Sequence, residues 1–459
     1  MPREYALFSI RIRGAGPDSY TIDVQSALGG DASGAFVTPA RDPRYQELAR
    51  RLQSLDTDED LLIELGTILF QSIFQGGVKE VYARSQGRLA EGQGLRLRLD
   101  LDPAQAEIAG LPWEFLYDPD QGPLALLDAP IVRYLSQQSA PPMLQTTLPL
   151  KVLVTSAVTP PAPDVERELA EVRAALAGLE RSGHVAIRVE EHLTQPVLQR
   201  RLREGFQVWH FIGHGGFSRD GRSGTLVFED GAGSSKAVSA AELNILLNRS
   251  GVRLILLDAC DSARLTTEPY RSVAPALVRA QVPAVIAMQF TVPQEATRAF
   301  AGEFYRALAE GLPIDACVTE GRKAVMGETG LRNPDWGIPV VYTRAPDGRL
   351  FDPAAPATAT PARPAAGNSV VVGSGNVLQP GSSINISGVG STSVQPDDEE
   401  RRDRIAELEG LIKANKSRLY QRELQKARYG ISADPSITIE VEDLTREIAK
   451  LERELQTLR

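Results

Sequence analysis

The hydrophobic pattern at the start of the chain predicts an α+β domain over residues 1–145. Three stretches alternate apolar and polar residues with period two, as strands with one buried face do. They are Tyr5–Ile12, Tyr20–Val24 and Leu95–Leu101, and the segments Ala109–Tyr117 and Ile131–Leu135 complete the domain. Leucines and isoleucines at steps of three and four predict one helix over Pro43–Phe74, with Asp42 as its N-cap.

From Leu148 onward the pattern changes to a regular alternation of short apolar runs and amphipathic stretches. The predicted strands are Lys151–Thr155, Val185–Val189, Val208–Ile212, Leu254–Leu257, Ala284–Met288 and Ile338–Thr343. The predicted helices are Val165–Leu179, Gln195–Gly205, Ser239–Asn248, Ser272–Ala280, Glu295–Gly311 and Ile314–Met326. A polar, glycine-rich excursion over Ser218–Ser235 interrupts them. The alternation predicts an α/β domain over residues 146–350, a mostly parallel sheet with helices on both faces.

The end of the chain has no core-forming pattern until its last 60 or so residues. Residues 351–398 are rich first in Pro and Ala and then in Gly, Ser and Asn, which predicts a linker, with a weak β-element as the alternative over residues 367–393. Residues 399–459 predict a helical hairpin or coiled coil. Its heptad positions are Leu444, Ile448, Leu451, Leu455 and Leu458. Short helices of this kind are marginal alone, so the seam predicts pairing with itself or with another protein.

Two of the predicted strands end on residues that carry chemistry. Val208–Ile212 runs into the glycine-flanked His214, and Leu254–Leu257 runs into Asp258 and then Cys260. In open α/β sheets the chemistry lies at the carboxyl ends of the strands. A thiol attacks as the thiolate and needs a base nearby, which makes His214 and Cys260 a candidate catalytic dyad. The backbone N–H groups of Gly215 and Cys260 are candidates for binding an oxyanion.

Other interpretations of these residues exist. A lone cysteine at a strand end is more often structural, but the His-Gly motif upstream argues against this for Cys260. His210 and His214 resemble a metal-binding pair, yet the sequence offers no further ligand at useful spacing. We therefore expect no metal or cofactor, and we expect His210 to be packed beneath the site. Cys317, the second of the two cysteines, is predicted to be a small buried hydrophobe.

The composition of the chain argues against several classes of protein. A net charge of -9 argues against a general nucleic-acid binder, and two cysteines argue against a disulfide framework. No run of about 18 apolar residues predicts a membrane span. The first ten residues lack the apolar core of a signal peptide. These features predict a cytoplasmic protein with no membrane and no nucleic-acid partner.

His210-Phe-Ile-Gly-His-Gly215, followed by Leu257-Asp-Ala-Cys-Asp-Ser-Ala263, resembles the CHAT family of bacterial caspase-like cysteine proteases, in the clan of caspases, separases and metacaspases. Leu111-Pro-Trp-Glu-Phe-Leu-Tyr117 and Asn333-Pro-Asp-Trp-Gly-Ile-Pro339 resemble other parts of that family. His214 precedes Cys260 by about 46 residues, close to the caspase spacing of roughly 50. The resemblance implies Cys260 as nucleophile, His214 as general base and Gly215 in the oxyanion hole.

Asp258 suggests a substrate preference. The pattern Asp-x-Cys-x-Ser is similar to that of metacaspases, where the acidic residue binds a basic P1 side chain. A carboxylate at a strand end suits Arg or Lys, although Asp258 could equally cap the following turn. Cys260 is followed by Asp261 and not by the residue-glycine pair of caspases, so aspartate specificity does not transfer.

The resemblance implies a cysteine endopeptidase that cleaves a protein substrate. By analogy with the family, the chain is an effector protease in bacterial conflict or defence signalling. The tail, residues 399–459, resembles the adaptor-like helical modules that recruit or cluster such proteins. Two alternatives stay open: a catalytically silent CHAT-fold scaffold that assembles through its tail, and a hydrolase of another acyl group.

Overall fold

The computed structural model describes residues 4–16, 19–53, 57, 60–101, 105–135, 144–157, 163–217, 224–260, 273–290 and 293–354, with six positions between 444 and 453. The chain divides into two compact units, Met1–Ala362 and Arg363–Arg459. Every element below belongs to the first unit unless stated otherwise.

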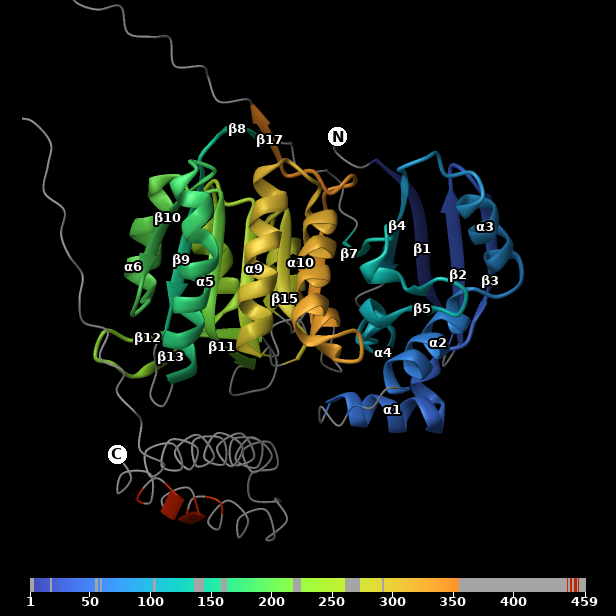
Figure 1. Ribbon diagram of the computed structural model, residues 1–459, viewed down its shortest axis with the longest axis horizontal. Coiled ribbons are helices and arrows are strands. Elements are labelled where there is room, and N and C mark those ends of the chain that lie inside the picture. Colours follow the sequence, from blue (N-terminus) through green and yellow to red (C-terminus); the bar gives the residue numbers. More distant parts are fainter. Residues whose placement is uncertain are drawn as a thin grey trace, which may run out of the picture. The chain divides into compact units, whose positions relative to one another are not determined.

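Within the described residues, thirteen strands form one sheet (Figure 1). Eleven of them follow the order β10 (Val185–Glu190), β9 (Leu150–Ser156), β11 (Val208–Phe217), β14 (Leu254–Cys260), β15 (Ala284–Met288), β16 (Pro339–Thr343), β7 (Ile131–Tyr134), β4 (Gly94–Leu101), β1 (Tyr5–Gly16), β2 (Ser19–Ser26) and β3 (Gly30–Phe36). The other two, β12 (Gly224–Glu229) and β13 (Ser235–Ser239), extend from β11 off this path. The pairs from β10 to β15 and from β16 to β1 are parallel. Only β15–β16, β1–β2 and β2–β3 are antiparallel along this path. The predicted mostly parallel sheet is confirmed.

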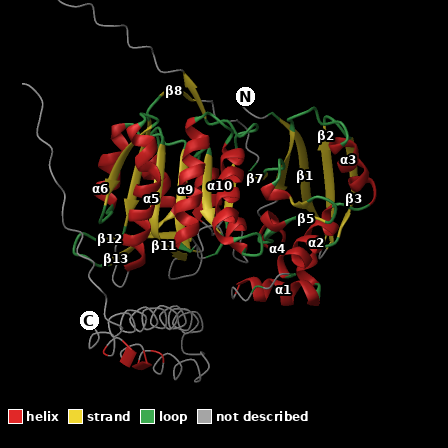
Figure 2. Ribbon diagram, viewed as in Figure 1, coloured by secondary structure: helices red, strands yellow, loops and turns green. Residues whose placement is uncertain are grey.

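Helices cover both faces of the β10–β15 part of the sheet, as predicted (Figure 2). One face carries α5 (Pro163–Arg181), α9 (Gln294–Ala309) and α10 (Ile314–Thr329). The other carries α6 (Gln195–Arg201), α7 (Ala240–Leu247) and α8 (Val273–Arg279). Alternate strand residues enter the two layers: Val208 and Ile212 pack in the first, Trp209 and Phe211 in the second. Strands apolar on both faces require this double cover.

The N-terminal part adds α1 (Pro43–Gln53), α2 (Leu61–Ile73), α3 (Gly76–Gln86) and α4 (Ala106–Ala109). The single helix predicted over 43–74 was wrong, because α1 ends at Gln53 and α2 begins at Leu61. The intervening sequence carries four acidic residues in five positions, which repel one another and favour turns over helix. Asp42 caps α1 as predicted, accepting a 2.7 Å hydrogen bond from the backbone N–H of Arg44.

Short elements connect these parts. Two small sheets pair β5 (Tyr117–Asp118) with β6 (Gly122–Pro123) and β8 (Leu144–Thr147) with β17 (Phe351–Ala354). The 3-10 turns are η1 (Pro39–Arg41), η2 (Trp113–Phe115), η3 (Leu124–Leu126), η4 (Leu202–Glu204) and η5 (Pro334–Gly337).

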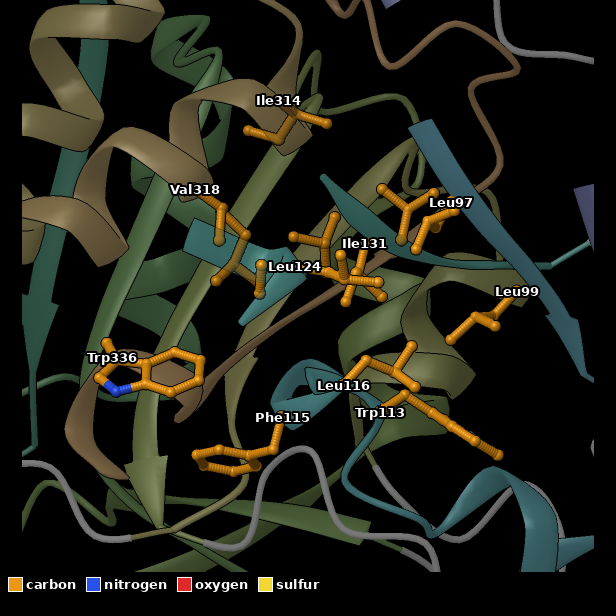
Figure 3. Packing of buried hydrophobic residues seen from close by; sticks show 14 of the residues in the cluster. Leu97, Leu99, Trp113, Phe115, Leu116, Leu124, Ile131, Ile314, Val318 and Trp336 are labelled. Atoms are coloured by element: carbon orange, nitrogen blue, oxygen red, sulfur yellow. The ribbon is translucent and has the colours of Figure 1, made fainter. Parts of the chain in front are cut away.

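One hydrophobic core crosses the middle of the sheet, where β7 joins β16. Figure 3 shows Phe115 of η2 beside Trp336 of η5, with their ring centroids 5.2 Å apart, and Trp113 of η2 beside Leu116. The register pairs across this junction are Tyr342 with Arg133 and Thr343 with Tyr134. The predicted domains 1–145 and 146–350 therefore share a sheet and a core, and their exact boundaries stay a prediction.

In the part of the chain that the structure describes, no single helix is long and apolar enough to cross a membrane. Helices α2 and α3 satisfy that test of length and composition only when taken together across a bend of 104°. Both helices contribute buried side chains to the core, among them Leu65, Leu69 and Val81.

The second unit is described at six positions, all helical. Leu444 is buried and Leu451 is half-buried. The other four are exposed and charged: Arg446, Glu447, Lys450 and Arg453. The predicted hairpin or coiled coil stays a prediction, because the remainder of the module lies outside the described residues. The linker over 351–398 also lies outside them, apart from its first four positions, which form β17.

Candidate active site

The two strands that carry the predicted dyad are neighbours in the sheet. β11 and β14 run parallel, and their register pairs His210 with Leu256, Ile212 with Asp258 and His214 with Cys260. Neighbouring strands lie about 4.8 Å apart. The backbone positions of His214 and Cys260 are therefore side by side at the end of the parallel pairing, which is also the carboxyl end of β14, where α/β proteins place their chemistry.

His214 is half-buried and lies within a strand that is longer than predicted. β11 continues to Phe217, and its last residues pair antiparallel with β12 (Gly224–Glu229), which pairs in turn with β13 (Ser235–Ser239). The predicted polar excursion thus contains a strand, because Leu226 and Phe228 are fully buried against Trp209 and Phe211. His214 is held by β14 on one side, and the following Gly215 pairs with Leu226.

Gly213 has a packing role at this strand end. Its backbone is extended and pairs with Ala259. A Cβ added there would come within 2.9 Å of the Phe211 ring. The absence of a side chain at position 213 therefore lets the aromatic ring lie close beside the strand that carries His214.

Asp258 lies inside the protein, with 6% of its surface exposed. Its Oδ2 is 4.0 Å from Nε2 of His210, which is fully buried as predicted. On its other ring nitrogen, Nδ1, His210 meets the hydroxyl of Tyr305 at 3.1 Å. These three residues are called the strand-end cluster below. Burial raises the pKa of the Tyr305 hydroxyl, and the nearby Asp258 adds to this effect.

Tyr305 belongs to this cluster and was missed by sequence reasoning. It lies on α9, 95 residues after His210. The local sequence offers one indication of its role. Tyr305 lies on the apolar face of an amphipathic helix, and the hydroxyl of a buried Tyr usually needs a hydrogen-bond partner.

The second cysteine is not a competitor for the role of nucleophile. Cys317 is fully buried on α10, and its Sγ donates to the carbonyl oxygen of Leu312 at 3.4 Å. Burial raises the pKa of its thiol, with Asp315 adding to the rise. The predicted burial of Cys317 is confirmed.

No metal centre is evident among the residues with described positions, since none of them form a group of three or more His, Cys, Asp or Glu able to hold an ion. The remaining histidines lie elsewhere: His184 contacts the Ser182 hydroxyl at 2.7 Å, and His192 contacts Glu229 at 3.0 Å.

Comparisons with known proteins relate the chain to one family. A protein-family model described as "CHAT domain" matches residues 60–356, more than half of the chain. Among solved structures, the Saccharomyces cerevisiae separase–securin complex at 2.6 Å is similar with a TM-score of 0.44 and 13% identity, over 73% of this chain and 30% of that one. The same complex at 3.0 Å gives a TM-score of 0.41 and 13% identity, over 74% and 30%. This chain thus spans under a third of the length of those chains. No curated protein matches it.

Proposed function

The chain belongs to the CHAT domain family of caspase-like proteases, and on this premise we propose that it is a cysteine endopeptidase with a His214/Cys260 dyad. One observation carries the proposal. His214 and Cys260 are the last register partners in the parallel pairing of the adjacent strands β11 and β14. Two residues whose types suit nucleophilic catalysis are thus brought together from positions far apart in the sequence.

The proposed reaction needs only these residues and water. His214 accepts the thiol proton, and the Cys260 thiolate attacks the scissile carbonyl carbon. The backbone N–H groups of Gly215 and Cys260 stabilise the oxyanion of the tetrahedral intermediate. The C–N bond breaks as His214 returns the proton to the leaving amine, and an acyl-enzyme remains. Water, deprotonated by His214, then hydrolyses the thioester and frees Cys260.

For the substrate, we propose cleavage after Arg or Lys, with Asp258 in the P1 pocket. Asp258 precedes the proposed nucleophile on the same strand and is largely shielded from water. A carboxylate in such surroundings attracts a cation more strongly than an exposed one does. The competing role, in which Asp258 caps the turn after β14, would leave P1 selectivity untouched.

The proposed setting is a cytoplasmic effector protease in bacterial conflict or defence signalling, recruited or clustered through residues 399–459. Support for the tail's role comes from the heptad pattern and from the alternation of less exposed Leu444 and Leu451 with exposed charged residues. The partner is then either a second copy of the chain or a separate protein.

The test is incubation of the purified full chain, and of a chain truncated after residue 354, with fluorogenic peptides bearing Arg, Lys, Asp or Leu at P1. We expect cleavage of the Arg and Lys peptides, loss of at least about 10³-fold in Cys260→Ala, and no loss in Cys317→Ala. Asp258→Asn should lower kcat/KM for basic P1 by roughly tenfold or more, with little change for Leu. An acidic or apolar preference would exclude the P1 proposal.

Thiol labelling separates the alternatives when no peptide is cleaved. Because Cys317 is buried, alkylation by iodoacetamide near pH 7 should occur at Cys260, as read by mass spectrometry of the labelled peptides. An unreactive Cys260 would favour the silent scaffold. A reactive Cys260 that turns over small esters but no peptide would favour a hydrolase of another acyl group.

A further inference from the structure

The strand-end cluster connects α9 to the proposed P1 residue through the interior of the protein. Tyr305 and His210 are both fully buried, and their rings lie 6.0 Å apart at an interplanar angle of 25°. The register partners of His210 are Val154 and Leu256, two buried aliphatic residues. The polar neighbours of the imidazole among the described residues are thus Tyr305 on one side and Asp258 on the other.

The hydrogen bonding of His210 is incomplete. Among the residues that the structure describes, its Nε2 has no hydrogen-bond partner, and Asp258 Oδ2 at 4.0 Å is too distant for one. Buried polar atoms in native proteins are nearly always paired, and the exceptions gather where function needs them. A histidine kept only for packing would not require a polar ring here, since its strand neighbours are aliphatic.

The surroundings of the ring select one tautomer. Burial keeps the Tyr305 phenol protonated, so its hydroxyl is able to donate to Nδ1. When Nδ1 accepts this hydrogen bond, the ring proton lies on Nε2, which faces the Asp258 carboxylate. At 4.0 Å this N–H and the carboxylate make no hydrogen bond, and they attract one another through space with less screening by water than groups at the surface.

We infer that His210 and Tyr305 are positioning residues for P1 selectivity: Tyr305 holds the His210 ring, and its Nε2–H restrains one oxygen of Asp258, leaving the other for a P1 cation. This inference rests on the proposed function of the same site. It gives His210 and Tyr305 a part in selecting the P1 side chain, although neither residue touches the substrate.

The kinetic test compares full-chain variants on matched peptides with Arg or citrulline, its neutral isostere, at P1. We expect the ratio of kcat/KM for Arg over citrulline to fall roughly tenfold in His210→Met and roughly threefold in Tyr305→Phe. His210→Gln keeps an N–H donor near the position of Nε2 and should restore part of the ratio. A purely structural role would lower both rates together and leave the ratio unchanged, which would overturn the inference.

A matched control removes another buried tyrosine hydroxyl. Tyr82 lies in the N-terminal part of the sheet unit, where its hydroxyl contacts Asp118 at 3.3 Å. Tyr82→Phe should change stability to a similar degree and leave the Arg-to-citrulline ratio as in the wild type. A fall of the ratio in this variant equal to that in Tyr305→Phe would also contradict the inference.

A second readout does not depend on activity. The chain has four histidines, so ¹⁵N-histidine labelling of the full chain gives four imidazoles to assign. Long-range ¹H–¹⁵N correlation should show His210 as the Nε2–H tautomer, with both tautomers populated in Tyr305→Phe and in Asp258→Asn. An Nδ1–H tautomer in the wild type would overturn the inference. If no peptide is cleaved, the proposed function fails. The tautomer of His210 then tests by itself whether Tyr305 and Asp258 hold the ring as inferred.

Discussion

Two buried polar clusters lie on the same sheet, and they differ in how completely their hydrogen bonds are made. The junction cluster, Arg133, Glu114 and Gln289, lies where β7 meets β16. There Arg133 donates to both oxygens of Glu114 at 3.0 and 2.7 Å and to two backbone carbonyls. Gln289 donates to the carbonyl of Gly337 at 2.7 Å. In the strand-end cluster, by contrast, His210 keeps one nitrogen without a partner in the described structure.

The difference separates stability from function. A fully bonded buried ion pair specifies one way for two parts of a molecule to pack, and it has no capacity left for a ligand. An incompletely bonded group costs free energy in the resting protein, and proteins tolerate that cost mainly at functional sites. The junction cluster therefore defines how the N-terminal strands join the sheet, and the strand-end cluster lies where chemistry is proposed.

The largest effect is expected when the junction cluster loses its carboxylate. Glu114 is fully buried, and a second arginine, Arg322, lies buried near it. Burial lowers the pKa of Arg322 to about 10, and Glu114 opposes this shift. Glu114→Met should lower the free energy of unfolding by about 3–5 kcal/mol, because it leaves two buried cations without a counter-charge. Urea unfolding followed by the fluorescence of Trp113 and Trp336 measures it.

The matched control is an exposed ion pair. Arg44 and Glu64 interact on the surface, with 48% and 39% of their side chains exposed. Glu64→Met should cost less than about 1 kcal/mol. Equal losses of unfolding free energy in Glu114→Met and Glu64→Met would mean that burial and complete hydrogen bonding do not make the junction cluster more stabilising than an exposed ion pair. The double variant Glu114→Met/Arg133→Met should be more stable than Glu114→Met alone.

A smaller, pH-dependent effect is expected at Asp335, a buried group outside both clusters. It is 4% exposed in η5, and its Oδ2 has no hydrogen-bond partner in the described part of the chain. Burial raises its pKa from 3.8 to about 6, with Glu295 adding to the rise. The folded state thus keeps a proton that the unfolded state loses, and the stability present below about pH 4 is lost as pH rises through 6.

Asp335→Asn removes this dependence. The unfolding free energy of the variant, relative to wild type, should rise by about 2–3 kcal/mol between pH 4 and pH 7. Asp230→Asn is the control of opposite sign, because the backbone N–H of Ala232 lowers the pKa of Asp230. For that variant the relative stability should fall as pH rises toward 3.8, the ordinary pKa of the carboxyl, and stay level above it. Parallel pH curves for Asp335→Asn and wild type would disprove the assignment.

A small effect on stability, well below that of Glu114→Met, is expected for a complete polar pair at the surface. Ser239 caps α7: its hydroxyl accepts from the N–H of Glu242 at 3.3 Å, and the Glu242 carboxylate accepts from the N–H of Ser239 at 2.8 Å. Ser239→Ala should cost about 1 kcal/mol of stability and leave peptide cleavage unchanged. Thr194→Ala, at the N-cap of α6, is the matched comparison in thermal unfolding. A loss of stability in Ser239→Ala as large as that in Glu114→Met would contradict the ranking of these effects by burial.

Much of this architecture could be predicted from local pattern. Continuous apolar runs predicted the central strands, and three- and four-residue steps predicted the helices around them. The helix break before Leu61 and the strand β12 were missed for opposite reasons. An acidic run ended one helix despite a continuing leucine pattern, and a polar, glycine-rich stretch became a strand because Leu226 and Phe228 complete a core formed by distant residues.

What the sequence by itself determined is which residues lie at the ends of buried strands, since periodicity and strand-breaking glycines are local properties. His214 and Cys260 were placed at strand ends in this way. Only the tertiary structure decided that β11 and β14 are neighbours in a register that pairs these two residues, and that Tyr305 reaches His210 from a helix 95 residues away. Burial can be inferred from the pattern of one segment, whereas the choice of partner depends on the free energy of packing the whole chain.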